Sequence, residues 1–177
     1  MSDNVENKGD TPIHPVWDVY YEYRTARFNV YYYERLHGSL QRLNFWIELI
    51  LALSVPSIAG LWFWETTIGS IFWKVVAGLA ALLAVIKPLV GLSDKIQQNS
   101  EVLTKWRVLH GDFQKLTYSI SQLRKYDEKM KEHFLKLLET KATIKEPPEA
   151  ANDRLVKICF EKVNKELPMN NFFVPED

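Results

Sequence analysis

The sequence predicts an all-α protein in which an integral membrane two-helix hairpin is joined to long cytoplasmic N- and C-terminal helices. Two apolar stretches, residues 43–64 and 68–92, lie on either side of a turn of about five residues. The first holds about 22 residues, which at ~1.5 Å per residue reach roughly 33 Å and cross a hydrocarbon core of ~30 Å. A soluble helical bundle that buries both stretches is the alternative, but the rest of the chain is strongly charged and offers little apolar surface to surround them.

The overall composition is that of one compact domain without a nucleic-acid partner. The 177 residues include 22 Lys and Arg and 22 Asp and Glu, so the formal net charge is zero. A protein that binds nucleic acid directly is expected to carry a basic excess. The single cysteine, Cys159, excludes a disulfide within the chain, and no Cys and His spacing indicates a zinc site. The polar N-terminus lacks the basic and apolar regions of a cleavable signal peptide.

The sequence contains no signature of a catalytic site. A Gly-rich phosphate loop, a nucleophile elbow and a zincin motif are absent, and only seven glycines are present to build special loops. We therefore expect no enzymatic activity, no cofactor and no bound metal.

The N-terminal segment predicts a helix that is rich in aromatic residues. Residues 1–11 are expected to be disordered, and a helix over 12–42 is expected to run almost continuously into the first apolar stretch. Its aromatic residues spread around the helix, since Tyr31, Tyr32 and Tyr33 point in three directions. This pattern predicts burial against the other cytoplasmic helices with some interfacial contact. A platform that stacks nucleobases is the alternative, but no phosphate-binding group accompanies it.

Flanking cations set the orientation of the predicted hairpin, residues 43–92. Because cations flank the ends remote from the turn and the turn holds none, the positive-inside rule places both termini in the cytoplasm. These cations are Arg24, Arg27, Arg35 and Arg42 before the hairpin region and Lys87, Lys95, Lys105 and Arg107 at its end and beyond. Lys74 lies near the turn, where we expect it to snorkel toward water among neighbouring tryptophans.

Two charged residues of the hairpin are predicted to meet. Counted from Thr67 at the centre of the turn, Glu48 lies 19 residues back and Lys87 lies 20 residues forward. Antiparallel helices then place them at depths within roughly 1.5 Å of each other. We interpret them as an interhelical ion pair, with two alternatives: residues that line an ion pathway, or two separately solvated charges. Pro56, in the middle of the first stretch, predicts a kink.

Small residues on both stretches predict close helix packing. In the second stretch they recur at four-residue spacing, and the first offers matching small surfaces. The candidate packing residues are Ser57, Gly60, Ala77, Ala80, Ala81 and Ala84. Because they cover more than one helical face, they leave surface for contacts between protomers, and we expect a homo-oligomer.

An amphipathic segment, residues 93–142, predicts one long cytoplasmic helix or two. Its near-heptad stripe is expected to form a core first and an interface second. The stripe comprises Ile96, Leu103, Trp106, His110, Phe113, Ile120, Met130, Phe134 and Leu137, widened by Leu109, Leu116 and Leu123. We expect His110 to be a packing residue with its polar groups satisfied, because no partner lies at metal-binding spacing.

A proline-containing linker, residues 143–152, separates this segment from a C-terminal helix and tail, residues 153–177. Pro147 and Pro148 end the preceding helix, and Asn152 or Asp153 is placed to cap the next one. Cys159 lies on the apolar stripe of that helix and is expected to be a buried small apolar residue. The apolar tail is expected either to dock on the protein or to bind a partner.

This layout resembles the SLATT family, bacterial two-transmembrane effectors associated with nucleotide-second-messenger defence systems. The resemblance covers most of the chain. It is based on the helix YRTARFNVYYYERLHGSLQRL before the hairpin, the short turn, the helix SDKIQQNSEVLTKWRVLHGDFQKLTYSISQL after it, and the segment DRLVKICFEKV with its lone cysteine. None of these is a catalytic fingerprint, and no site residue is transferred from the family.

The resemblance implies a pore-forming or membrane-disrupting effector of bacterial antiviral defence that acts by abortive infection. Such a protein would oligomerise in the bacterial inner membrane. Its partners would be the lipid bilayer, further copies of itself, and a partner defence protein or nucleotide-signalling enzyme that supplies the trigger. The residues alone leave a second interpretation open: a membrane-anchored scaffold that recruits partners through its cytoplasmic helices and forms no pore.

Overall fold

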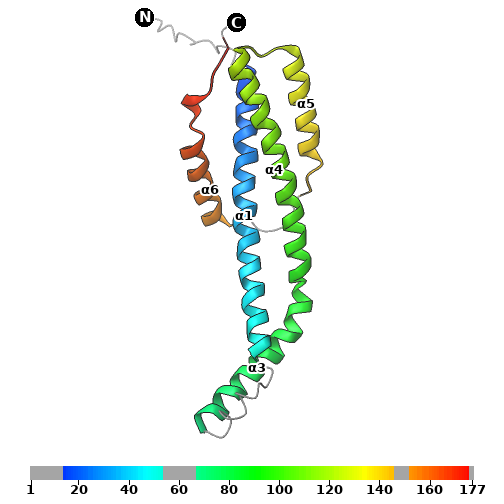
Figure 1. The fold of residues 1–177 in the computed structure, drawn as a ribbon, viewed down its shortest axis with the longest axis vertical. Helices are drawn as coiled ribbons and strands as arrows, with labels where there is room; N and C mark the ends of the chain where they lie inside the picture. The colour runs from blue at the N-terminus through cyan, green and yellow to red at the C-terminus, as the bar shows by residue number, and fades with distance from the viewer. Residues whose placement is uncertain (1–13, 54–66, 146–151, 176–177) are drawn as a thin grey trace, which may run out of the picture. The chain divides into compact units, whose positions relative to one another are not determined.

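The computed structural model describes residues 14–53, 67–145 and 152–175, and these residues are helical, with no strand among them (Figure 1). The elements are α1 (Val16–Leu53), α3 (Thr67–Val90), α4 (Leu92–Leu123), α5 (Glu128–Ala142), α6 (Asp153–Glu166) and the 3₁₀ helix η1 (Met169–Asn171). The predicted all-α class is confirmed for this part of the chain. The predicted disorder of residues 1–11, the kink at Pro56 and the hairpin turn lie outside the described residues.

Local polar contacts explain where several helices begin. At the start of α1, His14 Nδ1 accepts a hydrogen bond of 3.1 Å from the backbone N–H of Val16. The helix then continues to Leu53 without a break at residue 42. Asn152 caps α6 as predicted, because its side chain accepts a hydrogen bond of 3.1 Å from the backbone N–H of Leu155.

The segment 93–142 forms two helices and not one. α3 and α4 are separated at Gly91, which adopts the left-handed conformation with φ of 58°. α4 ends at Leu123, and α5 begins at Glu128, capped by Asp127, whose side chain accepts from the backbone N–H of Met130. Arg124, with φ of 50°, makes the turn between them. A long amphipathic segment therefore folds back on itself.

The chain divides into two compact units. Unit 1 contains residues 1–31 and 104–177, and unit 2 contains residues 32–103. The predicted hairpin, residues 43–92, falls within unit 2, which extends beyond it at both ends. α1 and α4 each contribute residues to both units.

Unit 1 has an apolar core formed by α1, α4 and α5, which lie side by side in Figure 1. Its fully buried side chains include Val19 and Tyr20 of α1 and Phe113 of α4, and the ring of Phe113 lies 6.2 Å from that of Phe134 on α5. Buried members of the predicted stripe within this unit are Trp106, Leu109, Phe113, Leu116, Ile120, Met130, Phe134 and Leu137. Leu123 is 58% exposed, so its inclusion in the stripe was wrong: α4 ends there, and the described residues leave its side chain largely uncovered.

Unit 2 buries few of its described side chains. Ala80 of α3 and Leu92 of α4 are buried, whereas large apolar side chains of α3 are between 40 and 64% exposed. These exposed side chains are Ile71, Val75, Leu79, Leu82, Val85 and Ile86. In the ranges that the structure describes, no helix combines the length and the apolar character needed to cross a membrane.

Candidate functional site

The predicted ion pair between the two apolar segments is present in unit 2. Lys87 Nζ of α3 lies 2.9 Å from Glu48 Oε1 of α1, and Asn44 Nδ2 donates to the same oxygen at 2.9 Å. Counting residues from the turn therefore gave the correct pairing. The Lys87 side chain is 26% exposed and that of Glu48 is 57% exposed, so the carboxylate is open on the side away from its partners.

The residues predicted to pack between helices differ in their burial. Ala80 is buried within unit 2, whereas Ala81 and Ala84 are exposed. Ser57 and Gly60 lie outside the described residues, and the side chain of Ala77 is likewise not among those described. The exposed alanines leave one small-residue face of α3 available for a contact that is not made within the described part of the chain.

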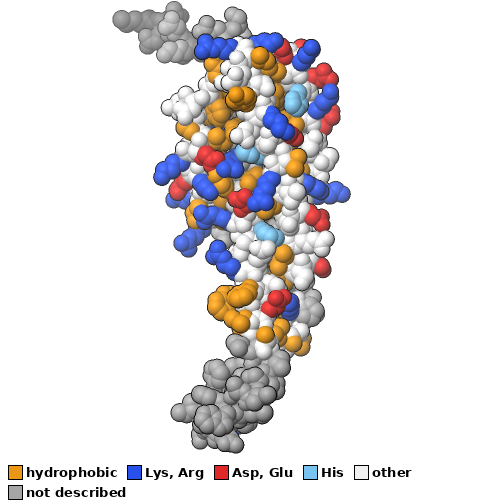
Figure 2. Space-filling view, in the orientation of Figure 1, with side chains coloured by type: hydrophobic (Ala, Val, Ile, Leu, Met, Phe, Trp, Pro, Cys, Tyr) orange, Lys and Arg blue, Asp and Glu red, His pale blue; other side chains and the backbone are white. Residues whose placement is uncertain are grey.

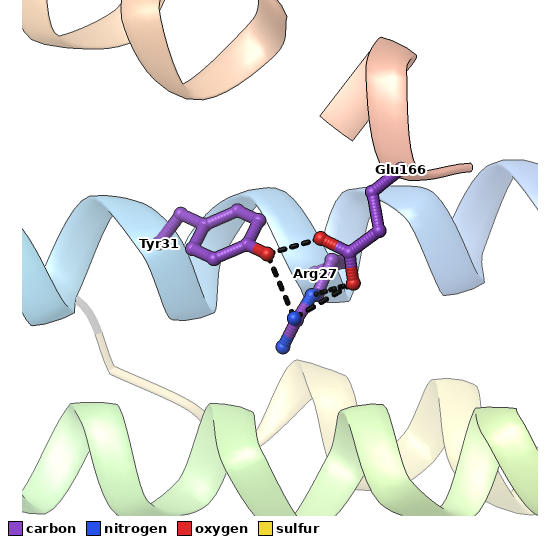
Figure 3. Close-up of polar contacts among 3 residues, drawn as sticks. All are labelled: Arg27, Tyr31 and Glu166. Carbon is purple, nitrogen blue, oxygen red and sulfur yellow. Dashed lines mark hydrogen bonds and ion pairs between the residues drawn. The ribbon is translucent and has the colours of Figure 1, made fainter. Parts of the chain in front are cut away.

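A second polar cluster, which sequence analysis did not predict, holds α6 against α1 in unit 1 (Figure 3). Arg27 donates from Nε to Glu166 Oε1 at 3.0 Å, and its Nη2 lies 2.7 Å from the same oxygen. Tyr31 donates its hydroxyl hydrogen to Glu166 Oε2 and accepts from Arg27 Nη2 at 2.7 Å. The three side chains thus close a ring of hydrogen bonds that joins the middle of α1 to the last turn of α6.

Further contacts reinforce the attachment of α6. The Lys162 ammonium lies 3.6 Å from the centroid of the Tyr31 ring, a cation–π contact, and Arg24 Nη2 donates to Asn164 Oδ1. On the apolar side of α6, Cys159 is fully buried and Val163 nearly so. The prediction that Cys159 is a buried small residue is confirmed. We call the group Arg24, Arg27, Tyr31, Lys162, Asn164 and Glu166 the α6 clasp.

The C-terminal tail continues this attachment along α1. The Phe172 ring stacks on Tyr20 at 4.3 Å, and the Tyr20 hydroxyl donates to the carbonyl oxygen of Phe173. Burial raises the pKa of Tyr20 to about 12, so its hydroxyl stays protonated and keeps donating at physiological pH. Of the two outcomes left open for the tail, docking on the protein is the one observed.

Electrostatics favour the charged form of Glu166 in the α6 clasp. Partial burial alone would raise the pKa of this carboxyl group, but hydrogen bonds from Tyr31 and Arg27 outweigh burial and lower the pKa below its ordinary value. Burial and the hydrogen bond to Glu166 raise the pKa of Tyr31. The glutamate is therefore the acceptor and the tyrosine the donor at neutral pH.

His110 packs in the core of unit 1, as expected, but one of its nitrogens is not satisfied. Its ring stacks on Tyr23 with centroids 5.1 Å apart, and its Nε2 is buried without a hydrogen-bond partner in the described structure. Burial and the charge of Arg27 lower the pKa of His110 to about 4, against a smaller opposing effect of Glu166. The imidazole is therefore neutral at physiological pH.

No catalytic or metal-binding arrangement is found among the described residues. They contain no group of three or more His, Cys, Asp or Glu side chains that could hold a metal ion. On the face seen in Figure 2, Lys and Arg side chains are interspersed with Asp and Glu over the described surface.

Comparison with known proteins does not assign the chain to a family. The chain matches no protein-family model, no curated protein and no solved structure.

Sequence reasoning found the Glu48–Lys87 pair and missed the α6 clasp. Arg27 and Glu166 are 139 positions apart, and neither interrupts a periodic pattern. The only signal was the polar side of α6, where Lys162 and Glu166 lie four residues apart and so share a face. That pattern is also typical of a solvated helix surface, and it does not identify the partner.

Proposed function

We propose that this chain is an oligomeric membrane effector of bacterial antiviral defence. In this proposal residues 43–92 cross the inner membrane as a hairpin with both termini in the cytoplasm, and a partner sensor triggers pore formation or membrane disruption. The resemblance to SLATT proteins supports the biological role. The observation on the structure that carries the proposal is the exposure of the apolar side chains of α3.

The large apolar side chains of α3 are more exposed than those that form the core of unit 1. Unit 1 has a core of buried aromatic and aliphatic residues, whereas side chains of α3 such as Val75, Leu82 and Val85 lie more than half exposed. Exposed apolar surface costs about 25 cal/mol per Å² in water, and soluble proteins rarely present large contiguous apolar patches. A hydrocarbon environment removes this cost, which favours insertion of the segment into a bilayer.

The Glu48–Lys87 pair favours assembly of several protomers. The Glu48 carboxylate is the more exposed partner, and a charge that faces hydrocarbon is costly. The side chain must therefore meet water, lipid headgroups or a neighbouring protomer. The exposed small residues Ala81 and Ala84 would allow a neighbouring helix to approach closely. Few polar residues are present in residues 43–92 of each protomer, so a pore would need several copies and an apolar gate that wets on opening.

Inducible expression in a bacterium tests the proposal. The protein is fractionated while a dye reports the membrane potential, and Glu48→Gln is compared with Glu139→Gln, an exposed carboxylate of α5. We expect the wild type and Glu139→Gln to reside in the inner membrane and depolarise the cells, and Glu48→Gln to reside there with altered depolarisation. Recovery in the soluble fraction would refute the hairpin.

A membrane-anchored scaffold is the second candidate, favoured by exposed apolar side chains on unit 1. Tyr118 and Leu135 are 65% and 51% exposed although this unit has its own core, so they are available to a partner protein. A scaffold would keep the membrane potential intact at high expression. A scaffold would lose partner binding on Leu135→Ser and would tolerate Ala80→Leu. A pore would show altered depolarisation on Ala80→Leu and would tolerate Leu135→Ser.

A further inference from the structure

A groove of about 360 Å³ lies between α1 and α6 in unit 1, beside the α6 clasp. α1 lines it with Tyr21, Thr25 and Phe28, which lie on successive turns of one helical face. Val156 and Phe160 line the opposite wall on α6. The lining is mostly apolar, and the side chains of Tyr21 and Phe160 at its sides are 55% and 58% exposed.

The size and lining of the groove restrict what can occupy it. Ligand pockets span roughly 300 to 1,000 Å³, so this one is at the small end. Apolar walls on both sides favour a hydrocarbon chain over a strongly hydrated ligand such as a sugar or a nucleotide. The small volume favours a single chain over the two acyl chains of a phospholipid.

One cation lines the groove, and it has donors to spare. Arg24 reaches the groove from α1, and its Nη2 donates to Asn164 Oδ1. Its Nε is buried and has no hydrogen-bond partner in the described structure, so the Nη groups are the donors that a ligand in the groove could reach. No described carboxylate forms an ion pair with Arg24, unlike Arg27, which is paired with Glu166. A guanidinium with unused donors is suited to a carboxylate, which accepts two parallel hydrogen bonds.

We propose that the groove binds a free medium-chain fatty acid, with its carboxylate on Arg24 and its acyl chain between α1 and α6. The charge of Arg24 selects an anionic head over a cationic or neutral one, and the apolar walls accept the tail. This binding site is independent of the proposed pore, because it uses residues of unit 1 only.

Binding at this groove has a measurable consequence for α6. The acyl chain contacts Phe160 and Val156, which flank the buried Cys159 on the same helix. A ligand that binds only when α6 is docked stabilises the docked state by mass action. Cys159 is fully buried, so a thiol reagent must await local opening of α6. Fatty acid should therefore slow the labelling of the chain's single cysteine.

The test measures N-ethylmaleimide labelling of Cys159 by mass spectrometry, on the full chain in nanodiscs of zwitterionic lipid at constant pH. Decanoate is compared with decanol and decyltrimethylammonium. At a concentration ten times its Kd, decanoate should slow labelling about tenfold, whereas the other two should not protect. Equilibrium dialysis of radiolabelled decanoate against empty nanodiscs measures binding directly.

Three variants make the test specific. Arg24→Gln should lose both saturable binding and protection, and Val156→Trp should do the same by filling the groove. Arg154→Gln, which alters an exposed arginine at the start of α6, should retain both.

Absence of saturable binding to the wild type would overturn the proposal. Equal protection by decanol would overturn carboxylate recognition, as would unchanged protection in Arg24→Gln. If nanodiscs of anionic lipid protect Cys159 without decanoate, the occupant is a lipid headgroup and the assignment to a free fatty acid is wrong.

Discussion

Replacement of Glu166 by Gln should loosen the attachment of α6 to α1. The variant keeps the size of the side chain and removes the charge that accepts hydrogen bonds from Arg27 and Tyr31. The side chains of Arg27 and Glu166 are 24% and 39% exposed, so the pair is intermediate between a buried and a surface contact. Hydrogen bonds to charged groups contribute about 1.5 to 3 kcal/mol, and exposed ion pairs about 0 to 1 kcal/mol.

We therefore expect docking of α6 to weaken by about 1 kcal/mol, which corresponds to a roughly fivefold larger population of the open state. The assay is again the labelling rate of Cys159, which is a fully buried residue of α6 and is the chain's only thiol. Labelling follows the open population when reclosing is faster than reaction with the reagent. The matched control is Glu161→Gln, an exposed carboxylate on the same helix, which should label at the wild-type rate.

Salt separates an electrostatic effect from a packing effect. Raising the NaCl concentration should speed the labelling of the wild type, because it screens the partly exposed pair, and should change Glu166→Gln much less. Equal labelling rates for the wild type and Glu166→Gln would refute the claim that this carboxylate holds α6. Faster labelling together with loss of total helix content would indicate global unfolding instead of release of α6.

Three further predictions concern the stability of the fold. His110→Phe should remove a pH dependence of the free energy of unfolding. The pKa of His110 is about 4 in the folded protein and 6.5 ordinarily, so the unfolded chain binds more protons between these values. The stability of the wild type therefore falls as the pH drops from 6.5 to 4. After allowance for partial exposure we expect a loss of about 1 to 2 kcal/mol across this window in the wild type and little in the variant, measured by chemical denaturation at pH 7 and pH 4.5. Phe113→Ala should cost about 3 to 5 kcal/mol because its ring is fully buried, whereas Leu135→Ala on the exposed side of α5 should change the free energy of unfolding by less than about 0.5 kcal/mol. Gly91→Ala should destabilise the α3–α4 junction by about 1 kcal/mol, because φ of 58° disfavours a side chain, and a melting temperature equal to that of the wild type would contradict this.

Helical periodicity was enough to predict most of what α4 and α5 contribute to the core of unit 1. The positions of Trp106, Phe113 and Ile120 repeat every seven residues, and all three are buried. The same pattern gave a wrong prediction for Leu123. Periodicity indicates which face of a helix is buried, but it does not indicate where the helix ends. The turn after Leu123 did have a signal, since Asp127 is a favourable N-cap residue three positions before Met130.

A pairing between helices could be predicted from the sequence only where the two helices are close in the sequence. Glu48 and Lys87 lie on either side of one predicted turn, so counting residues along two helices predicted to be antiparallel brings them together, and the pair is observed. Arg27 and Glu166 are separated by the whole of α3, α4 and α5, and no count of residues relates them. The groove beside them was equally hidden, because Tyr21 and Phe160 each read as an isolated exposed aromatic on its own helix.

The distribution of apolar side chains gives α6 a different role from the other helices of unit 1. α1, α4 and α5 share a core of fully buried aromatic residues, whereas α6 adds only Cys159 and Val163 to the buried set and relies on the charged and polar α6 clasp for the rest. Charged contacts at partly exposed positions are weak and sensitive to salt, so we expect the attachment of α6 to depend on salt more than the shared core does. α1, to which α6 is attached, is also the helix that continues through Glu48 into the apolar segment. α1 therefore contributes residues both to the α6 clasp and to the Glu48–Lys87 pair.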